Sequence, residues 1–196
     1  MQRRRLAAVR GSFTLLSSVA LAVMAAVAAY IWFGGYNVAA DKPHWKITAR
    51  LIEAVRERSI TVRARNLAVP DSLNQPLRIE AGADLYDEMC TDCHLAPGKK
   101  NSELRRGLNP QPPDLPTDGI DDPQTAFWTI KHGVKLTAMP AWGLSHTDQQ
   151  IWDMVAFLRK VQNMPEARYQ ALVAAGGAHA GPHAHGAHGQ GDEHGH

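Results

Sequence analysis

The segment from Gly11 to Ala40 runs for 30 positions without a charged residue. Its apolar part, FTLLSSVALAVMAAVAAYIWF, extends from Phe13 to Phe33 and is 21 residues long. A helix of that length rises about 31 Å, which matches a hydrocarbon core of about 30 Å. This segment is therefore predicted to cross a membrane as a helix, and the chain that follows it must fold on one side of that membrane.

Basic residues flank the segment unequally. Four arginines precede it: Arg3, Arg4, Arg5 and Arg10. The next basic residue, Lys42, follows it. Because lysine and arginine close to a membrane segment stay on the cytoplasmic side, residues 1–10 are predicted to be a cytoplasmic end and residues 11–36 a single anchor. The predicted location is the cytoplasmic (inner) membrane, with the rest of the chain in the periplasm.

A cleaved signal peptide is the alternative, because Val38, Ala39 and Ala40 resemble a small-residue cleavage site. Signal-peptide cores are usually about 7 to 15 residues long, which is shorter than this run. The end of the run also carries aromatic residues typical of a membrane interface: Tyr30, Trp32 and Tyr36. These features favour the uncleaved anchor, and both interpretations export the remaining chain.

The charge of the exported part excludes nucleic acid as a partner. Setting the four leading arginines aside from the 21 Lys and Arg leaves 17, against 19 Asp and Glu. Binding to nucleic acid requires a dense basic surface that displaces counterions. A slightly acidic domain does not provide one.

Residues 41–78 are predicted to form an amphipathic helix, over about 43–65, and a linker. Asp41 and Pro43 are typical helix-start residues. Apolar residues then recur at spacings of three, four and seven: Ile47, Leu51, Ile52, Val55 and Val62. These residues are predicted to form the buried face of the helix, and the charged face is predicted to be solvated.

Residues 79–164 are predicted to form one domain, with helices over about 79–90, 123–133 and 147–162. Thr147 and Gln150 form a capping-box pattern at the start of the third helix. From Ala96 to Pro123 the chain has six prolines and three glycines, which argue against a long regular element. No segment alternates like a strand, so the predicted fold class is all-α.

Residues 165–196 are predicted to be a flexible tail. From Gly176 onward the composition is dominated by Gly, Ala and His, and six of the last 21 residues are histidine. A segment without large apolar residues cannot build a core.

The chain has two cysteines, in CTDCHLAPG at residues 90–98. A thioredoxin-type site is expected beside a βαβ pattern, and the sequence has no convincing strands. A structural zinc site needs four ligands, and the sequence has no second cysteine pair. Exported thiols otherwise tend to form a disulfide. Haem attachment uses both sulfurs in thioether bonds and makes the adjacent histidine an axial ligand of the iron. Covalent haem at Cys90, Cys93 and His94 is therefore the favoured interpretation.

Elimination indicates the second axial ligand. Five of the six methionines have other predicted positions: Met1 and Met24 before or within the membrane segment, Met89 on the cysteine-bearing helix, Met154 on the packing stripe of the last helix, and Met164 beyond it. Met139 remains, in the loop sequence TAMPAWG, where Pro140 disfavours helical geometry for it. His132 and His146, at helix ends, are the rival ligands.

These residues resemble the class I c-type cytochromes, which carry one haem. The resemblance covers about residues 79–162 and rests on Gly82, Tyr86, Cys90, Cys93, His94, Pro97, Met139, Pro140, Phe157 and Leu158. It implies a class I fold around one covalent haem c, with the first and last helices in close contact at Gly82. It also implies that the carbonyl of Pro97 accepts the Nδ1 proton of the haem histidine.

His/Met ligation occupies both axial positions of the iron, which suits electron transfer rather than catalysis. The predicted function is to pass single electrons between membrane-associated periplasmic partners, from a dehydrogenase or quinol-oxidising complex to a terminal oxidase or reductase. A haem peroxidase would need an open axial site, and often a second haem motif.

The alternative function is periplasmic metal handling, with the haem domain as a redox partner. Imidazoles suit copper, nickel and zinc. The tail site would consist of His179, His183, His185, His188, His194 and His196.

Overall fold

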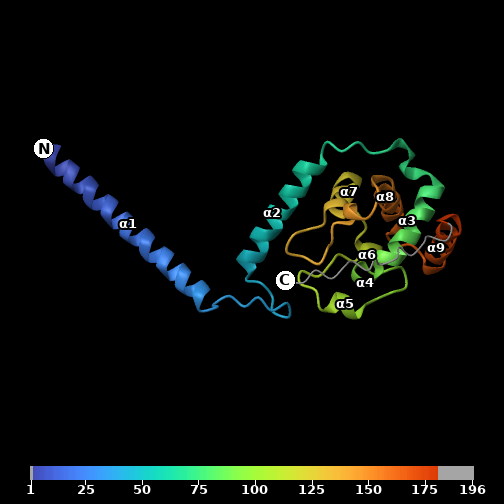
Figure 1. Cartoon of the computed structure of the whole chain (residues 1–196), viewed down its shortest axis with the longest axis horizontal. Helices are drawn as coiled ribbons and strands as arrows, with labels where there is room; N and C mark the ends of the chain where they lie inside the picture. The colour runs from blue at the N-terminus through green and yellow to red at the C-terminus, as the bar shows by residue number, and fades with distance from the viewer. Residues whose placement is uncertain (1, 181–196) are drawn as a thin grey trace, which may run out of the picture. The chain divides into compact units, whose positions relative to one another are not determined.

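The computed structural model describes the backbone of residues 2–180 and the side chains of residues 14–178 (Figure 1). This part of the chain is helical and has no strand, which confirms the predicted all-α class. The chain divides into two units, residues 1–42 and residues 43–196.

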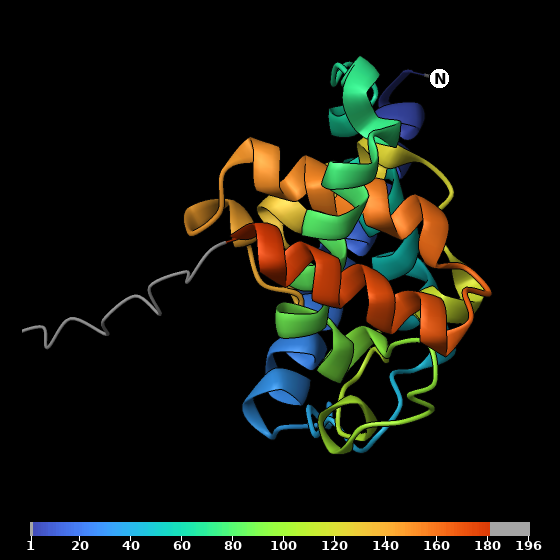
Figure 2. The same ribbon diagram turned by 90° about the vertical axis from the view of Figure 1, so that its right-hand side faces the viewer.

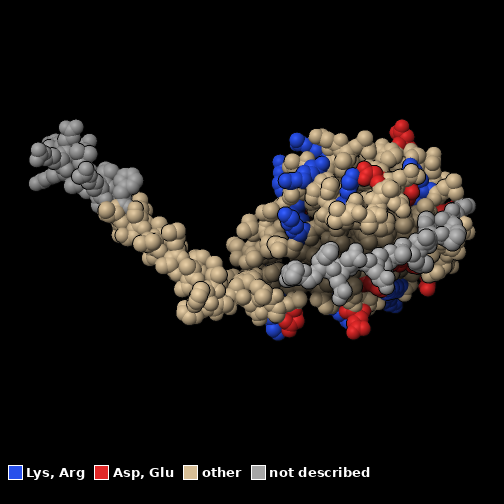
Figure 3. All heavy atoms as spheres, in the orientation of Figure 1, with Lys and Arg blue, Asp and Glu red and all other residues tan. Residues whose placement is uncertain are grey.

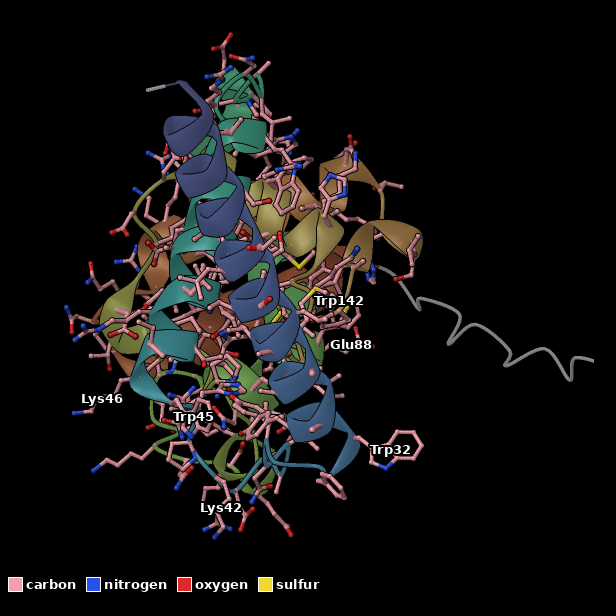
Figure 4. All side chains as sticks on the ribbon, turned by 90° about the vertical axis from the view of Figure 1, so that its left-hand side faces the viewer. Trp32, Lys42, Trp45, Lys46, Glu88 and Trp142 are labelled. Atoms are coloured by element: carbon pink, nitrogen blue, oxygen red, sulfur yellow. The ribbon has the colours of Figure 1, made fainter. Side chains whose placement is uncertain are left out.

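The first unit is built around α1 (Gln2–Trp32). Within the described residues, its segment Thr14–Trp32 is the one helix long and apolar enough to cross a membrane. The segment has no charged side chain and is tan throughout in Figure 3. Trp32, at its end, is 85% exposed and projects away from the ribbon (Figure 4).

The core of the second unit forms where α3 (Pro76–Met89) crosses α8 (Asp148–Val161). Gly82 lies at this crossing, where a Cβ would stand 1.9 Å from the carbonyl oxygen of Asp153. One turn further along α3, the Tyr86 ring packs on Phe157, with ring centroids 5.2 Å apart. The absence of a side chain at Gly82 therefore sets how closely the two helices approach.

Local sequence signals define the ends of the other main helices. α7 (Pro123–His132) begins after Asp122, whose carboxylate accepts from the backbone N–H of Thr125. The capping box predicted at Thr147 and Gln150 is confirmed at the start of α8. Short elements fill the intervals: η1 (Asp71–Asn74), α4 (Thr91–His94), α5 (Glu103–Arg106), α6 (Leu115–Asp118) and η2 (Trp142–Leu144).

The C-terminal segment differs from the sequence prediction. Residues 166–180, expected to belong to a flexible tail, form α9 (Glu166–Ala180), which packs along α3 (Figure 2). Tyr169 is 1% exposed, and its hydroxyl donates to the carboxylate of Asp87 at 2.5 Å. A Cβ at Gly176 would stand 2.2 Å from the carbonyl oxygen of Glu80. Gly176 thus allows two helices to pack closely, whereas the glycine-rich composition alone predicted a flexible segment.

The helix predicted over about 43–65 is α2 (Lys46–Ala64), which packs on α7. The face that it buries was predicted wrongly at three of its five residues, because Ile47, Leu51 and Val55 are all more than 60% exposed. The more protected positions of the helix are Thr48, Ile52, Arg56, Ser59, Ile60, Val62 and Ala64. α2 therefore turns an arginine toward the domain and an apolar row away from it.

Candidate functional site

A cavity of about 860 Å³ opens in the second unit, within the range of about 300–1,000 Å³ typical of cofactor sites. It is lined by segments from α2, α3, α4 and the loop between α7 and α8. The two cysteines and the two predicted axial ligands line it together: Cys90, Cys93, His94 and Met139. Pro97, the predicted hydrogen-bond acceptor for the haem histidine, is not among the lining residues.

The imidazole of His94 is held by one hydrogen bond. Its Nδ1 lies 3.1 Å from the carbonyl oxygen of Pro113. A carbonyl oxygen only accepts, so Nδ1 carries the proton and the Nε2 lone pair is available to a metal. Burial also lowers the pKa of His94, and the bond to Pro113 opposes this effect only in part. Both features favour the neutral ring, which is the form that binds metals.

The partner of His94 differs from the one implied by the family resemblance. Pro97 is buried and occupies a tight turn, in which the Lys99 N–H donates to the Ala96 carbonyl at 2.8 Å. Gly98, the next residue, has a φ of +89°, as the third residue of a type II turn requires. Pro97 therefore reverses the chain after the motif, and Pro113 provides the carbonyl.

Arg105, on α5, fixes this region and was not singled out in the sequence. Its guanidinium donates to the carbonyl oxygens of Cys93, at 3.0 Å, and of Pro113, at 3.4 Å. It also donates to the carbonyl of Pro112. Arg105 thus connects α4, which carries Cys93, to the loop whose Pro113 carbonyl binds the imidazole of His94.

A tight loop positions Met139 at the cavity. The N–H of Val134 donates to the Met139 carbonyl at 3.1 Å, and the Thr137 hydroxyl donates to the Val134 carbonyl at 2.8 Å. Gly133 has a φ of +63°, and a Cβ there would stand 2.7 Å from the Met139 carbonyl oxygen. Two methionines that the elimination set aside line the same cavity: Met89, on the cysteine-bearing helix, and Met154, on the packing stripe of the last helix.

The two cysteines are free thiols. Burial, with a smaller effect from Cys93, raises the pKa of Cys90 to about 12. The pKa of Cys93 is also raised, mainly by burial and next by Asp92. Both sulfurs are therefore held in the protonated form at neutral pH.

The rival axial ligands do not line the cavity, and the side chains of the tail histidines lie outside the described residues. Neither His132 nor His146 lines the cavity. Among the residues with described side chains, no group of three or more His, Cys, Asp or Glu is arranged to hold a metal ion. Of the six tail histidines, the structure describes only the backbone of His179; the others, His183, His185, His188, His194 and His196, lie outside the described residues.

Comparison with protein families agrees with the geometry. Residues 77–158 match the family described as cytochrome c oxidase, cbb3-type, subunit III. The domain is a c-type cytochrome. The match begins one residue into α3 and ends within α8, so it includes both cysteines and the crossing at Gly82. No curated protein and no solved structure matches the chain.

A cytochrome domain of this family implies covalently bound haem c, and the cavity fits that group. Its lining is mostly apolar, and it brings two reduced thiols, a neutral imidazole and a thioether together. The matched region excludes α2 and α9, which both pack on the cytochrome domain.

Proposed function

We propose that this protein is a monohaem electron carrier. α1 anchors it in the cytoplasmic membrane, and its cytochrome domain lies in the periplasm. It passes single electrons between membrane-associated redox partners, from a dehydrogenase or quinol-oxidising complex to a terminal oxidase or reductase. The oxidase subunit named in the matching family supports an oxidase as the acceptor.

The observation that carries this proposal is that Cys90, Cys93, His94 and Met139 line one cavity. Each thiol would add its S–H across one vinyl group of haem, a step that needs a reduced sulfur and no oxidant. His94 and Met139 would be the axial ligands, with Pro113 fixing the orientation of the imidazole. The bound iron supplies a one-electron couple.

A carrier of this kind needs both axial positions filled by the protein. Filling them leaves no site for oxygen or peroxide, and methionine ligation raises the reduction potential. The anchor confines the domain near membrane partners, which raises its effective concentration without a large interface.

The test is an optical spectrum of the haem-loaded protein, oxidised and reduced. We expect the weak far-red band that reports iron–methionine coordination in the ferric protein, and its loss in Met139→Ala. Met89→Leu and Met154→Leu are matched controls, because both methionines line the same cavity; both variants should keep the band. A wild-type protein that lacks the band and binds carbon monoxide readily would contradict the electron-carrier proposal.

A further inference from the structure

α2 lies outside the family match and still forms part of the cavity wall. Its residues Glu53, Arg56 and Ile60 line the cavity, and the helix packs on α7. The first residue of the match, 77, comes well after the end of α2 at Ala64. The matched cytochrome domain does not include α2, so the role of α2 at the cavity must be inferred from the side chains of α2 itself.

The charges around the cavity are unbalanced. Four carboxylates line it: Glu53, Asp118, Asp121 and Asp122. Among the described lining residues, Arg56 is the one Lys or Arg. Its side chain is 30% exposed, whereas the other arginines of α2, Arg50, Arg58 and Arg63, are classed as exposed.

Two of these carboxylates are engaged by the backbone. Asp118 accepts from the N–H of Asp114 at 2.9 Å, and Asp122 accepts from the N–H of Thr125 at 2.7 Å. Arg56 pairs only loosely with Glu53, since its Nη2 lies 3.8 Å from Oε1 of that residue, beyond hydrogen-bond distance. The Arg56 guanidinium can therefore bind a further anion.

Haem brings two carboxylates of its own, the propionates, into this cavity. A partly buried carboxylate requires a counter-charge or several hydrogen-bond donors. The aspartates and Glu53 would repel it, and a guanidinium presents a planar set of donors that matches a carboxylate. On the proposed function, we infer that Arg56 binds a haem propionate and that α2 is the helix that delivers this charge to the cytochrome domain.

A fixed positive charge in the haem cavity acts on the redox equilibrium. It stabilises the ferrous form, which has one positive charge fewer than the ferric form, so Arg56 raises the reduction potential. It also lowers the pKa of the propionate that it binds. With Arg56 present, the propionate is ionised near neutral pH in both oxidation states, and the potential varies little with pH there.

The test compares Arg56→Gln with Arg58→Gln in the haem-loaded protein. Arg58 lies on the same helix, is exposed and does not line the cavity, so its variant removes the same charge away from the site. We expect Arg56→Gln to shift the ferric–ferrous equilibrium toward ferric by up to about tenfold, equivalent to about 59 mV for one electron. Its potential should also fall as pH rises through the propionate pKa. Arg58→Gln should do neither, and Arg56→Lys should restore most of the effect.

Glu53→Gln provides an independent test, because removing this carboxylate from beside Arg56 should raise the potential. If Arg56→Gln fails to retain haem, the reduction potential of Glu53→Gln is the measurement that tests the assignment. Equal potentials and pH profiles for Arg56→Gln and Arg58→Gln, or a lowered potential in Glu53→Gln, would overturn the assignment. Haem content, measured on the wild type in the same preparation, separates the two proposals: a wild type without covalent haem contradicts the proposed function, and a loaded wild type with unresponsive variants contradicts only the role of Arg56.

Discussion

The carbonyl oxygen of Pro113 accepts a hydrogen bond from Nδ1 of His94, 3.1 Å away and 19 residues earlier in the chain. The same carbonyl lies 3.4 Å from the Arg105 guanidinium, which also holds the carbonyl of Cys93. Arg105 thus helps to orient the imidazole through the Pro113 carbonyl. None of these bonds joins Arg105 to the imidazole ring or to a cysteine sulfur.

Arg105→Met should loosen this arrangement. Hydrogen bonds to charged donors contribute about 1.5–3 kcal/mol each, and water will replace part of the loss, so we expect the free energy of unfolding to fall by about 2 kcal/mol. Arg106→Met removes the same charge from an exposed neighbour and should change stability by less than about 0.5 kcal/mol. Denaturant titration of the haem-loaded proteins measures both. Similar losses in the two variants would show that Arg105 does not hold the loop.

Gly82→Ala should disrupt the crossing of α3 and α8. The added methyl group would meet the Asp153 carbonyl oxygen at 1.9 Å, and helix backbone cannot move aside without separating the helices. We expect a loss of about 3 kcal/mol or more, at the upper end of overpacking effects. Gly107→Ala is the control, since its Cβ would meet its closest neighbour at 3.6 Å with a φ of −87°. A crossing that tolerated alanine at position 82 as well as at position 107 would be inconsistent with this packing.

Two adjacent glycines of α9 should respond differently to alanine. A Cβ at Gly176 would stand 2.2 Å from the Glu80 carbonyl oxygen, whereas one at Gly177 would meet the Asp84 carboxylate at an ordinary 3.4 Å. Gly176→Ala should therefore detach α9 and speed proteolysis near residue 166. Gly177→Ala should be neutral or stabilising by up to about 1 kcal/mol, because alanine favours helix over glycine. Limited proteolysis and thermal unfolding distinguish the variants, and equal behaviour would argue against close packing of α9 on α3.

Tyr169→Phe should change how stability depends on alkaline pH. Burial is the main cause that raises the pKa of Tyr169 far above its usual value, and the hydrogen bond to Asp87 adds to it. An unfolded tyrosine ionises near pH 10, so the folded state loses about 1.4 kcal/mol per pH unit above that pH for each such tyrosine. The variant should lose about 1 kcal/mol at pH 7, from the missing hydrogen bond, and should decline less steeply above pH 10. Unfolding free energies at pH 7 to 11 test this, and parallel curves for both proteins would contradict it.

Local signals in the sequence predicted the main helices well. The capping box at Thr147 and Gln150 acts within one turn, and Asp122 before Pro123 does the same for α7. Cys90, Cys93, His94 and Met139 line one cavity, as the motif requires. Met89 and Met154 line it too, so the choice of Met139 as the axial ligand stays a prediction.

The errors concern partners that are distant in the chain. Every residue has a carbonyl, so no pattern distinguishes Pro113 from Pro97 as the acceptor for His94; the nearer proline instead forms a turn with Gly98. In α2, apolar periodicity marked Ile47, Leu51 and Val55, but the cavity and α7 determine which face is covered. A pattern of apolar residues does not predict that the charged Arg56 faces the cavity.

The packing of α9 has a consequence for where the cytochrome domain ends as an independent folding unit. The family match stops at residue 158, and a cut at 164 would look reasonable from the motifs alone. Such a cut would remove Tyr169, Leu172 and Val173 from the core cluster and uncover the side of α3 against which they pack. The smallest fragment expected to fold and hold its haem unaided therefore retains the chain through Gly177.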